Sequence, residues 1–290
     1  MLQRKDKAGI YSWVDNNNGI VYNLIDQPAA TANYFMAATG IILVLKGTCQ
    51  ITSDQAGTVT LQAGQLLLLP KDLYTIAEHP SKEPVGRFEC LQFFFADELL
   101  ASYLQSTQGV GHVPLAPEGQ QVAIEGNPAI EAYALAVVRA MQEVPQPPAN
   151  LLELKLNELL HLLTAKANGR DFLGMLYALS VRKRRSLRMF MEQHYNKPLR
   201  VEDYAVLTGR SLSVFLRDFK EVFHATPKQW LMQKRLDRAH ILLATKDISI
   251  AQASHLVGYE NTSHFTKAFK DRYGRSPRQF VNTLVYGKSV

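Results

Sequence analysis

The C-terminal third of the chain alternates apolar and polar positions with the period of amphipathic helices. Apolar side chains recur three and four residues apart in two stretches, as Leu212, Phe215, Phe219 and Val222 and as Phe265, Ala268 and Phe269. This spacing places them on one face of a helix over about 211–223 and of another over about 261–273. A shorter helical pattern and a glycine, Gly209 or Gly258, precede each stretch. The pattern predicts two helix-turn-helix units.

The two units are copies of one module. An offset of fifty residues aligns Ser213 with Ser263, Phe215 with Phe265, Arg217 with Lys267, Phe219 with Phe269, Thr226-Pro227 with Ser276-Pro277, and Trp230 with Phe280. Between the copies, Pro227 begins an apolar pattern that predicts a helix to about Ala244, roughly 27 Å long. Successive major-groove segments on one face of DNA lie about 34 Å apart, so a rigid helix of this length suits two readers on adjacent turns.

The balance of charged residues changes where the duplicated C-terminal part begins. Residues 1–181 carry 11 basic and 17 acidic side chains, whereas residues 182–290 carry 21 basic and 9 acidic ones. A basic half suits a polyanion, although charge alone is equally compatible with a solvated surface on a helical bundle. The repetition of the same outer residues in both copies favours nucleic acid, because packing alone does not require it. Hydroxyl and cationic side chains on these faces predict contacts to bases and phosphates by Arg210, Ser213, Arg217, Lys220, Thr262, Ser263, Thr266, Lys267 and Lys270.

The N-terminal part has a different pattern, typical of antiparallel strands. Six short apolar runs, separated by turn residues at roughly ten-residue spacing, are Ile41–Leu45, Cys49–Thr52, Thr58–Leu61, Leu66–Leu69, Tyr74–Ala77 and Phe88–Phe95. They predict a β-barrel or sandwich, and Phe93 to Phe95 suggest a strand buried on both faces. No histidine precedes Ile76, so no metal site is expected here.

Helical patterns return after a loop rich in Gly and Pro over 109–127. Two patterns, 129–144 and 150–166, are separated by Pro145-Gln-Pro-Pro148 and predict an antiparallel hairpin. A leucine stripe on the second helix either docks on the barrel or meets a second copy of the chain, and the predicted dimerisation residues are Leu152, Leu156, Leu159 and Leu163. We therefore expect three segments, 1–104, 105–181 and 182–290.

The C-terminal residues resemble the AraC/XylS family of bacterial transcription regulators. The similarity covers about the last hundred residues and is carried by Lys234-Arg235-Leu236, Ala239, Ile250, Ala253, Gly258-Tyr259, Phe265, Phe269, Gly274 and Ser276-Pro277. The resemblance implies a seven-helix domain in which Ser213, Arg217, Thr262, Ser263, Thr266 and Lys267 lie where members usually touch bases. Leu216 departs from the family, because a polar reader often holds this place, and it points to a thymine methyl or to DNA shape.

The N-terminal half resembles the sensors that such regulators carry. The spacing of Gly64, Pro70 and Tyr74 is similar to the second half of a cupin motif, with tyrosine where a cupin enzyme tends to place histidine. The resemblance implies a metal-free, cupin-like barrel, and Tyr34 and Tyr74 are the residues we expect to contact an effector. Family members often dimerise through helices that follow the barrel, which favours a homodimer.

Composition narrows the remaining classes. The 290 residues are 47% hydrophobic and 20% charged, which is typical of globular domains. Two cysteines, a polar N-terminus and the lack of a long apolar run predict a cytoplasmic protein without a membrane span. No catalytic constellation or cofactor motif is recognisable, so no cofactor and no enzymatic activity are expected.

The fold class predicted from these patterns is α+β and multidomain, with an antiparallel barrel, a helical hairpin and an all-α domain with two helix-turn-helix motifs. The expected function is sequence-specific transcription regulation, with activation as the output and the N-terminal domain as the sensor. Its partners would be double-stranded promoter DNA, RNA polymerase and an effector. The alternatives are control by a partner protein instead of a small effector, a metal-free cupin enzyme with a DNA-binding domain, and a nucleoid-type binder without sequence preference.

Overall fold

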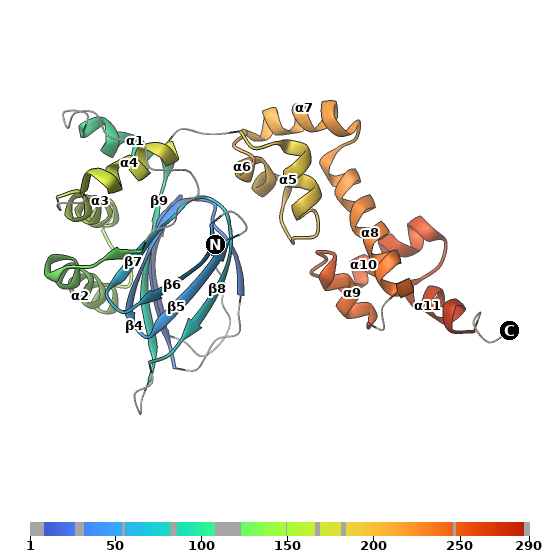
Figure 1. The fold of residues 1–290 in the computed structure, drawn as a ribbon, viewed down its shortest axis with the longest axis horizontal. Helices are drawn as coiled ribbons and strands as arrows, with labels where there is room; N and C mark the ends of the chain where they lie inside the picture. Colours follow the sequence, from blue (N-terminus) through green and yellow to red (C-terminus); the bar gives the residue numbers. More distant parts are fainter. Residues whose placement is uncertain are drawn as a thin grey trace. The chain divides into compact units, whose positions relative to one another are not determined.

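The computed structural model divides the chain into two compact units, Met1–Arg182 and Lys183–Val290, each described here by itself (Figure 1). It describes residues 9–26, 32–53, 56–81, 86–107, 123–148, 150–165, 169–180, 184–245 and 248–286. Most of the loop expected over 109–127, and residues 182 and 183 at the boundary between the units, lie outside these ranges.

Antiparallel strands form the first unit. They are β1 (Gly9–Asp15), β2 (Asn18–Ile25), β3 (Ala32–Phe35), β4 (Thr39–Lys46), β5 (Thr48–Ser53), β6 (Gly57–Gln62), β7 (Gln65–Leu69), β8 (Leu73–His79), β9 (Phe88–Phe95) and β10 (Ile124–Glu125). One sheet has the order β1-β2-β9-β4-β7-β10 and the other has the order β3-β8-β5-β6. Without the outer strands β1 and β10, the two four-stranded sheets β2-β9-β4-β7 and β3-β8-β5-β6 have the strand order of a double Greek-key jelly roll. This is the architecture of cupins. The expectation of a cupin-like, antiparallel N-terminal fold is confirmed.

Strand β9 shows how the sequence builds two cores from one sheet. Phe88 and Cys90 are buried in the core between the two sheets. Leu91, Phe93 and Phe95 are buried in a second core on the other face of the same sheet. Side chains alternate along a strand, so a strand covered on both faces must be apolar at nearly every position. This explains the run Phe93-Phe94-Phe95.

Four helices cover the outer face of the six-stranded sheet (Figure 1): α1 (Asp97–Ser106), α2 (Pro128–Glu143), α3 (Leu151–Thr164) and α4 (Gly169–Ser180). The leucine stripe of α3 belongs to this core, because Leu152, Leu156, Leu159 and Leu163 are at most 5% exposed. Of the two alternatives, docking on the sheet is therefore the observed one. An interface between copies would have to use other side chains of α3, such as the exposed Leu154.

The second unit is helical. Its helices among the described residues are α5 (Leu187–His194), α6 (Val201–Leu207), α7 (Leu212–Phe223), α8 (Pro227–Thr245), α9 (Ile250–Leu256), α10 (Thr262–Tyr273) and α11 (Pro277–Tyr286). The pairs α6 with α7 and α9 with α10 are the two helix-turn-helix units that the sequence pattern predicts. Gly209 and Gly258, the turn glycines, both have positive φ, of 71° and 86°. Such angles favour glycine because it lacks a Cβ.

The two copies repeat their aromatic packing closely. Ring centroids of Phe215 and Phe219 lie 5.5 Å apart, and those of the equivalent Phe265 and Phe269 lie 5.7 Å apart. The distance from Phe219 to Trp230 is 5.8 Å, and that from Phe269 to Phe280 is 5.9 Å. Internal repetition in the sequence is therefore also repetition of the core.

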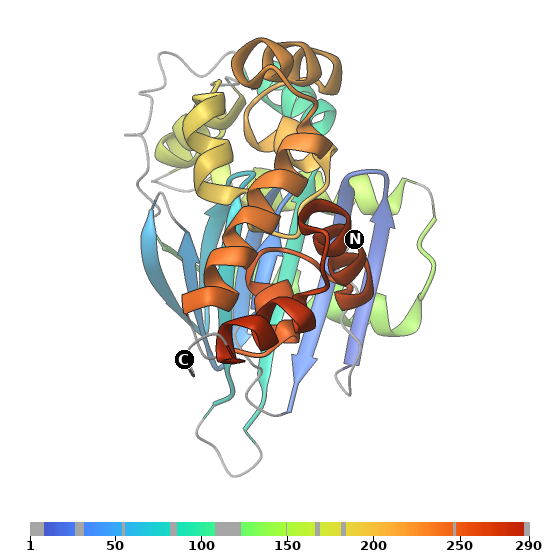
Figure 2. The ribbon, with the colours of Figure 1, turned by 90° about the vertical axis from the view of Figure 1, so that its right-hand side faces the viewer.

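Helix α8 belongs to both copies, and Figure 2 shows it as one continuous helix. Its first turns carry Trp230, which packs on Phe219 and Phe223 of the first copy. Its later turns carry Leu236 and Ala239, which are buried in the core of the second copy. At about 1.5 Å per residue, its 19 residues span roughly 28 Å. The prediction of a helix from Pro227 to about Ala244 agrees with this element to within a residue.

A close backbone approach also joins the two copies. A Cβ built on Gly258 would lie 2.5 Å from the carbonyl oxygen of Asn196, which follows α5 of the first copy. Arg235 of α8 donates to the carbonyl oxygens of Tyr195 and Lys197, at 2.7 and 2.6 Å. The turn of the second copy therefore rests against the first.

Candidate nucleic-acid interface

Helix α7 is the second helix of the first copy, and local sequence sets both of its ends. The Ser211 side chain accepts a hydrogen bond from the Val214 amide at the N-terminus. At the C-terminus, His224 adopts the left-handed conformation with φ of 53°. Phe215 and Phe219 are buried on the inner face. The outer face is left for solvent or a partner.

The predicted readers Ser213, Arg217 and Lys220 lie on this exposed outer face of α7. The Arg217 side chain is 64% exposed and its Nη2 donates to Asp218 Oδ1 at 3.2 Å. Two leucines share the surface, Leu212 and Leu216, with exposed fractions of 40% and 42%. The first reader helix therefore presents apolar groups beside its cation, as thymine methyl contacts require.

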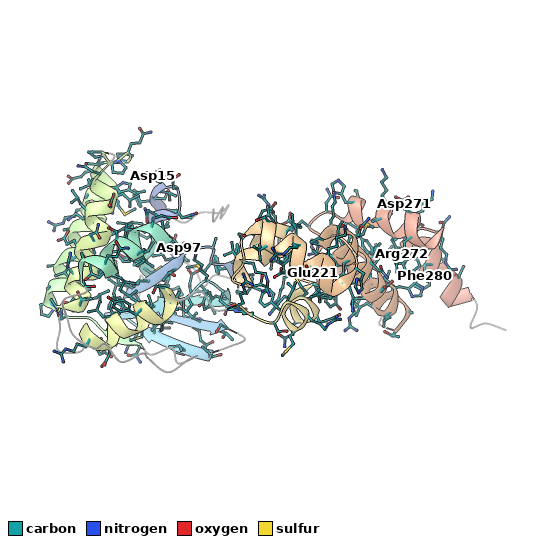
Figure 3. The ribbon with its side chains drawn as sticks, turned by 90° about the horizontal axis from the view of Figure 1, so that it is seen from above. Asp15, Asp97, Glu221, Asp271, Arg272 and Phe280 are labelled. Carbon is teal, nitrogen blue, oxygen red and sulfur yellow. The ribbon has the colours of Figure 1, made fainter. Side chains whose placement is uncertain are left out.

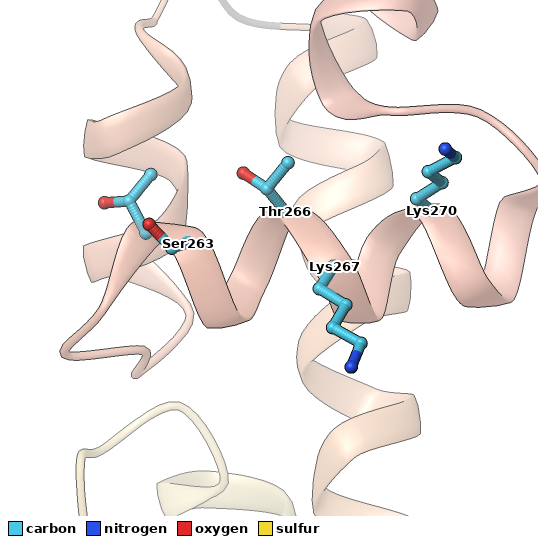
Figure 4. A pocket seen from close by; sticks show the side chains of 5 residues that line it. Ser263, Thr266, Lys267 and Lys270 are labelled. Carbon is cyan, nitrogen blue, oxygen red and sulfur yellow. The ribbon is translucent and has the colours of Figure 1, made fainter.

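Helix α10 has the same position in the second copy. Asn261 caps it by accepting hydrogen bonds from the Ser263 and His264 amides, at 2.8 and 3.3 Å. Gly274 ends it in the left-handed conformation with φ of 73°, in the position that His224 holds in the first copy. A shallow hollow on this helix is lined by residues that the sequence predicts to contact DNA, namely Thr262, Ser263, Thr266, Lys267 and Lys270. Figure 4 shows the labelled members along one length of the helix.

The face of α10 is polar where that of α7 is partly apolar. Hydroxyl groups can donate to and accept from base edges, and lysines can reach guanine or the phosphates. The structure thus brings the predicted residues together in two sets, one on each second helix. The side chains of both sets lie outside the buried aromatic cores.

Arg210 does not belong to either set. Its side chain is only 10% exposed, and its Nε donates to Asp218 Oδ2 at 3.0 Å. Its Nη1 donates to the carbonyl oxygens of Arg185 and Thr208, at 3.0 and 2.9 Å. The guanidinium is occupied inside the unit, so the sequence-based prediction of a DNA contact by Arg210 is corrected.

The prediction from sequence did not include two exposed cationic side chains of this unit. Lys228 and Arg278 are equivalent in the fifty-residue repeat, and each follows the proline that begins α8 or α11. A cation at the same exposed position of both copies is suited to a phosphate on each DNA segment. The alignment of the two copies at an offset of fifty residues already pairs these two cations.

The jelly roll places the predicted effector residues on neighbouring strands. Tyr34 of β3 pairs with Tyr74 of β8 in the register of the smaller sheet. The Tyr74 ring is buried in the core between the sheets, and its hydroxyl donates to the Pro70 carbonyl at 2.9 Å. Tyr34 is half-buried beside the same core. Tyr74 thus has a packing role, and Tyr34 is the more accessible of the two.

The two cysteines are free and lie in the same core. Burial raises the pKa of the Cys49 thiol to about 12, with a smaller contribution from Glu78. A thiol with so high a pKa is a poor nucleophile at neutral pH. Cys49 therefore acts as a small core residue.

Comparison with known proteins agrees with this division of the chain. A family model described as the ExsA N-terminal regulatory domain matches residues 39–175, and one described as a helix-turn-helix domain matches residues 204–283. The HTH-type transcriptional regulator ExsA of Pseudomonas aeruginosa is 28% identical over 243 residues, covering 82% of this chain and 84% of ExsA. The thermoregulatory protein LcrF of Yersinia pestis is 27% identical over 242 residues, covering 83% and 88%. Among solved structures, ToxT of Vibrio cholerae aligns with 91% of this chain and 98% of its own at 11% identity, with a TM-score of 0.36.

A regulatory jelly roll followed by a duplicated helix-turn-helix unit defines a DNA-binding transcription regulator. Both parts have matches, in the same order along the chain as in ExsA. Both parts of the chain are thus similar to AraC-family transcription regulators, in agreement with the sequence resemblance. No helix among the residues described combines the length and the apolar character needed to cross a membrane.

Proposed function

We propose that this chain is a transcription activator that binds two boxes of promoter DNA, one through α7 and the other through α10. The observation that carries the proposal is the equivalent construction of two reader helices with exposed polar and basic faces. Helix α8 holds both readers in one unit, which suits boxes on adjacent turns of the duplex. Activation is supported by a relative, the virulence regulon transcriptional activator VirF of Yersinia enterocolitica, 32% identical over 132 residues.

The proposed contacts are Ser213, Arg217 and Lys220 in the first box and Thr262, Ser263, Thr266, Lys267 and Lys270 in the second. Lys228 and Arg278 are proposed phosphate contacts. The protein would act in the cytoplasm as a homodimer and would recruit RNA polymerase. The segments 1–104, 105–181 and 182–290 would serve as sensor, dimerisation segment and DNA-binding domain.

Selection from a randomised duplex pool with the full chain tests the proposal. We expect enrichment of two short boxes about one helical turn apart. The matched control is the full chain with Arg217→Ala and Lys267→Ala together, which should enrich neither box strongly. Recovery of unrelated sequences by both proteins, with a steep salt dependence, would identify a non-specific binder instead.

A protein partner is the better candidate for the controlling signal than a small effector. Most side chains that fill the space between the two sheets are apolar and buried, Tyr74 and Phe88 among them, and the buried carboxyl group of Glu78 lies near Cys49 in the same core. A metabolite would have to displace such packing, whereas a partner protein can bind the outside of the unit. Tyr34, at the margin of this core, stays a proposed effector contact in the alternative case.

Fractionated cell lysate separates these two modes of control. DNA affinity of the purified full chain is measured after adding the small-molecule fraction or the protein fraction from ultrafiltration. Control by a protein predicts a change only with the second fraction, abolished by protease. A change with the first fraction, lost in Tyr34→Ala, would establish a small effector.

A further inference from the structure

Arg210 occupies the turn between α6 and α7 and contacts three parts of the second unit at once. Its three hydrogen bonds run to Asp218 of α7, to the carbonyl of Thr208 in the turn, and to the carbonyl of Arg185. Arg185 also donates its amide to the Thr208 carbonyl, at 3.3 Å. The planar guanidinium is suited to such multiple acceptors, because its donors point in fixed directions.

Arg185 lies at the start of the second unit. It immediately precedes Ser186, whose side chain caps α5 by accepting a hydrogen bond from the Met189 amide. The chain therefore passes from the regulatory unit into the DNA-binding unit at the point that Arg210 holds. Arg210 thus bonds directly to the backbone of the linker end.

Asp218 extends the contact to the surface of the reader helix. One carboxylate oxygen accepts from Arg210, and the other accepts from Nη2 of the exposed reader Arg217. The hydrogen bond from Arg210 is the main cause that lowers the pKa of Asp218, so the carboxylate is charged at neutral pH. Linker end, turn and reader thus form one hydrogen-bonded chain.

The second copy is built without this arrangement. At the positions equivalent to Arg210 and Asp218 it has Tyr259, which follows the turn glycine Gly258 as Arg210 follows Gly209, and Ala268. Its first helix, α9, begins at Ile250, shortly after α8 ends at Thr245, so the linker from the other unit does not enter there. The helix-turn-helix fold therefore does not require the pair, and its presence in the first copy calls for another reason.

We propose that Arg210 and Asp218 are positioning residues that couple the linker end at Arg185 to the reader Arg217. A change in the regulatory unit then alters recognition of the first DNA box and leaves the second box unaffected. The inference rests on the proposed two-box DNA binding. It adds where the regulatory signal enters the DNA-binding unit.

Two substitutions of Arg210 separate coupling from simple support of α7. In the full chain, Arg210→Lys can keep an ion pair with Asp218 but cannot reach all three acceptors. Arg210→Met removes every one of these bonds. The matched control is Arg272→Met, which removes an Arg–Asp pair between α10 and Asp237 of α8 in the second copy. Figure 3 labels Arg272 in the second unit.

The first measurement is affinity for the selected duplex with either box scrambled. Arg210→Met should lower discrimination at the first box about tenfold, in line with loss of one good base contact, and change the second less than twofold. Arg210→Lys should retain most of the discrimination. Arg272→Met should spare the first box. Equal loss at both boxes in Arg210→Met would overturn the proposal.

The second measurement is amide hydrogen exchange, which needs no DNA site. In the free protein, Arg210→Lys should raise exchange in residues 184–190 but not in 212–223, and Arg210→Met should raise it in both. With the selected duplex, only the wild type should gain protection in 184–190 when the first box is intact. Unchanged exchange in 184–190 for both variants would refute the coupling. A failed selection would reject two-box binding, while this exchange pattern in the free protein would still decide whether Arg210 joins the linker end to α7.

Discussion

The two helix-turn-helix copies have nearly the same core and different surroundings. Their aromatic distances agree within a few tenths of an ångström, as between Phe219 and Phe223 at 4.5 Å and Phe269 and Tyr273 at 4.7 Å. Their reader faces differ, because α7 exposes Leu212 and Leu216 whereas α10 exposes hydroxyls and lysines. Packing constrains the buried positions of a duplicated module, and the exposed positions are free to specialise. The first copy bonds to the linker end at Arg185, and the second presents a polar surface on α10.

The largest expected difference concerns the equivalent aromatic residues Trp230 and Phe280. Replacing either by Ala should cost about 3–5 kcal/mol of local stability. Trp230 lies in the shared helix α8, so Trp230→Ala should lower discrimination at both boxes, whereas Phe280→Ala in α11 should affect the second box alone. Thermal unfolding and binding to box-scrambled duplexes measure the two effects. Intact second-box recognition in Trp230→Ala would show that the copies are independent.

The next largest effect is expected at the glycine that joins the copies. Gly258→Ala combines a left-handed φ with a clash against the Asn196 carbonyl, and should destabilise the second unit by roughly 2–4 kcal/mol. Gly274→Ala is the control, because its φ is also positive but its Cβ would meet nothing within 4 Å. It should cost only about 1 kcal/mol. Equal melting temperatures for the two variants would contradict the close contact.

The reader residues should show an intermediate effect on binding. Arg217→Ala and Lys267→Ala should each weaken binding to the selected duplex by about 1–3 kcal/mol, each at its own box. Titration against duplexes with one scrambled box measures this. If either variant loses the same affinity on random DNA, that side chain contacts phosphate and not a base.

A smaller effect is expected where the copies exchange Ala for Ser in their first helices. Ser254 is fully buried, and its hydroxyl has no hydrogen-bond partner among the residues that the structure describes. Its equivalent is the buried Ala205. Ser254→Ala should stabilise the unit by up to about 1 kcal/mol, and Ala205→Ser should destabilise it by about 1–3 kcal/mol. Chemical denaturation tests both, and a loss of stability in Ser254→Ala would reveal a partner for this hydroxyl.

The smallest effect concerns the C-terminal caps of the reader helices. His224 adopts a left-handed conformation that its equivalent, Gly274, adopts without strain. His224→Gly should stabilise the first copy by roughly 0.5–1 kcal/mol, after allowance for the greater freedom of glycine in the unfolded chain. The reverse change, Gly274→His, should destabilise. A lower melting temperature for His224→Gly would mean that the histidine side chain contributes more than its backbone costs.

The sequence predicts the second unit better than the first, for physical reasons. The ends of α7 and α10 follow from local rules of periodicity and capping, and the predictions agree within a residue. Strand β1 escapes prediction because only Trp13 on it is buried, so no alternation shows in its sequence. Helices α4 and α5 are also missed, although α11 follows from the fifty-residue repeat once Pro277 is aligned with Pro227.

The candidate site was predictable only as far as exposure follows from helical periodicity. Arg217 and Lys267 lie on the outer faces for this reason. Arg210 follows a turn, and nothing in its sequence separation from Asp218 distinguishes an internal ion pair from a DNA contact. The leucines of α3 show the same limit, because a stripe has the same period whether a sheet or a second copy covers it.

Helix α8 has a consequence for the arrangement of promoters. The helix is continuous, and Gly258 and Arg235 fix the second copy against the first, so the described residues show no hinge between α7 and α10. Each base pair inserted between the two boxes rotates one box by about 34° relative to the other. Insertion of five base pairs would place the boxes on opposite faces of the duplex, whereas insertion of a full turn would restore the face but exceed the reach of α8. Genuine target promoters should therefore share one fixed interval between their boxes.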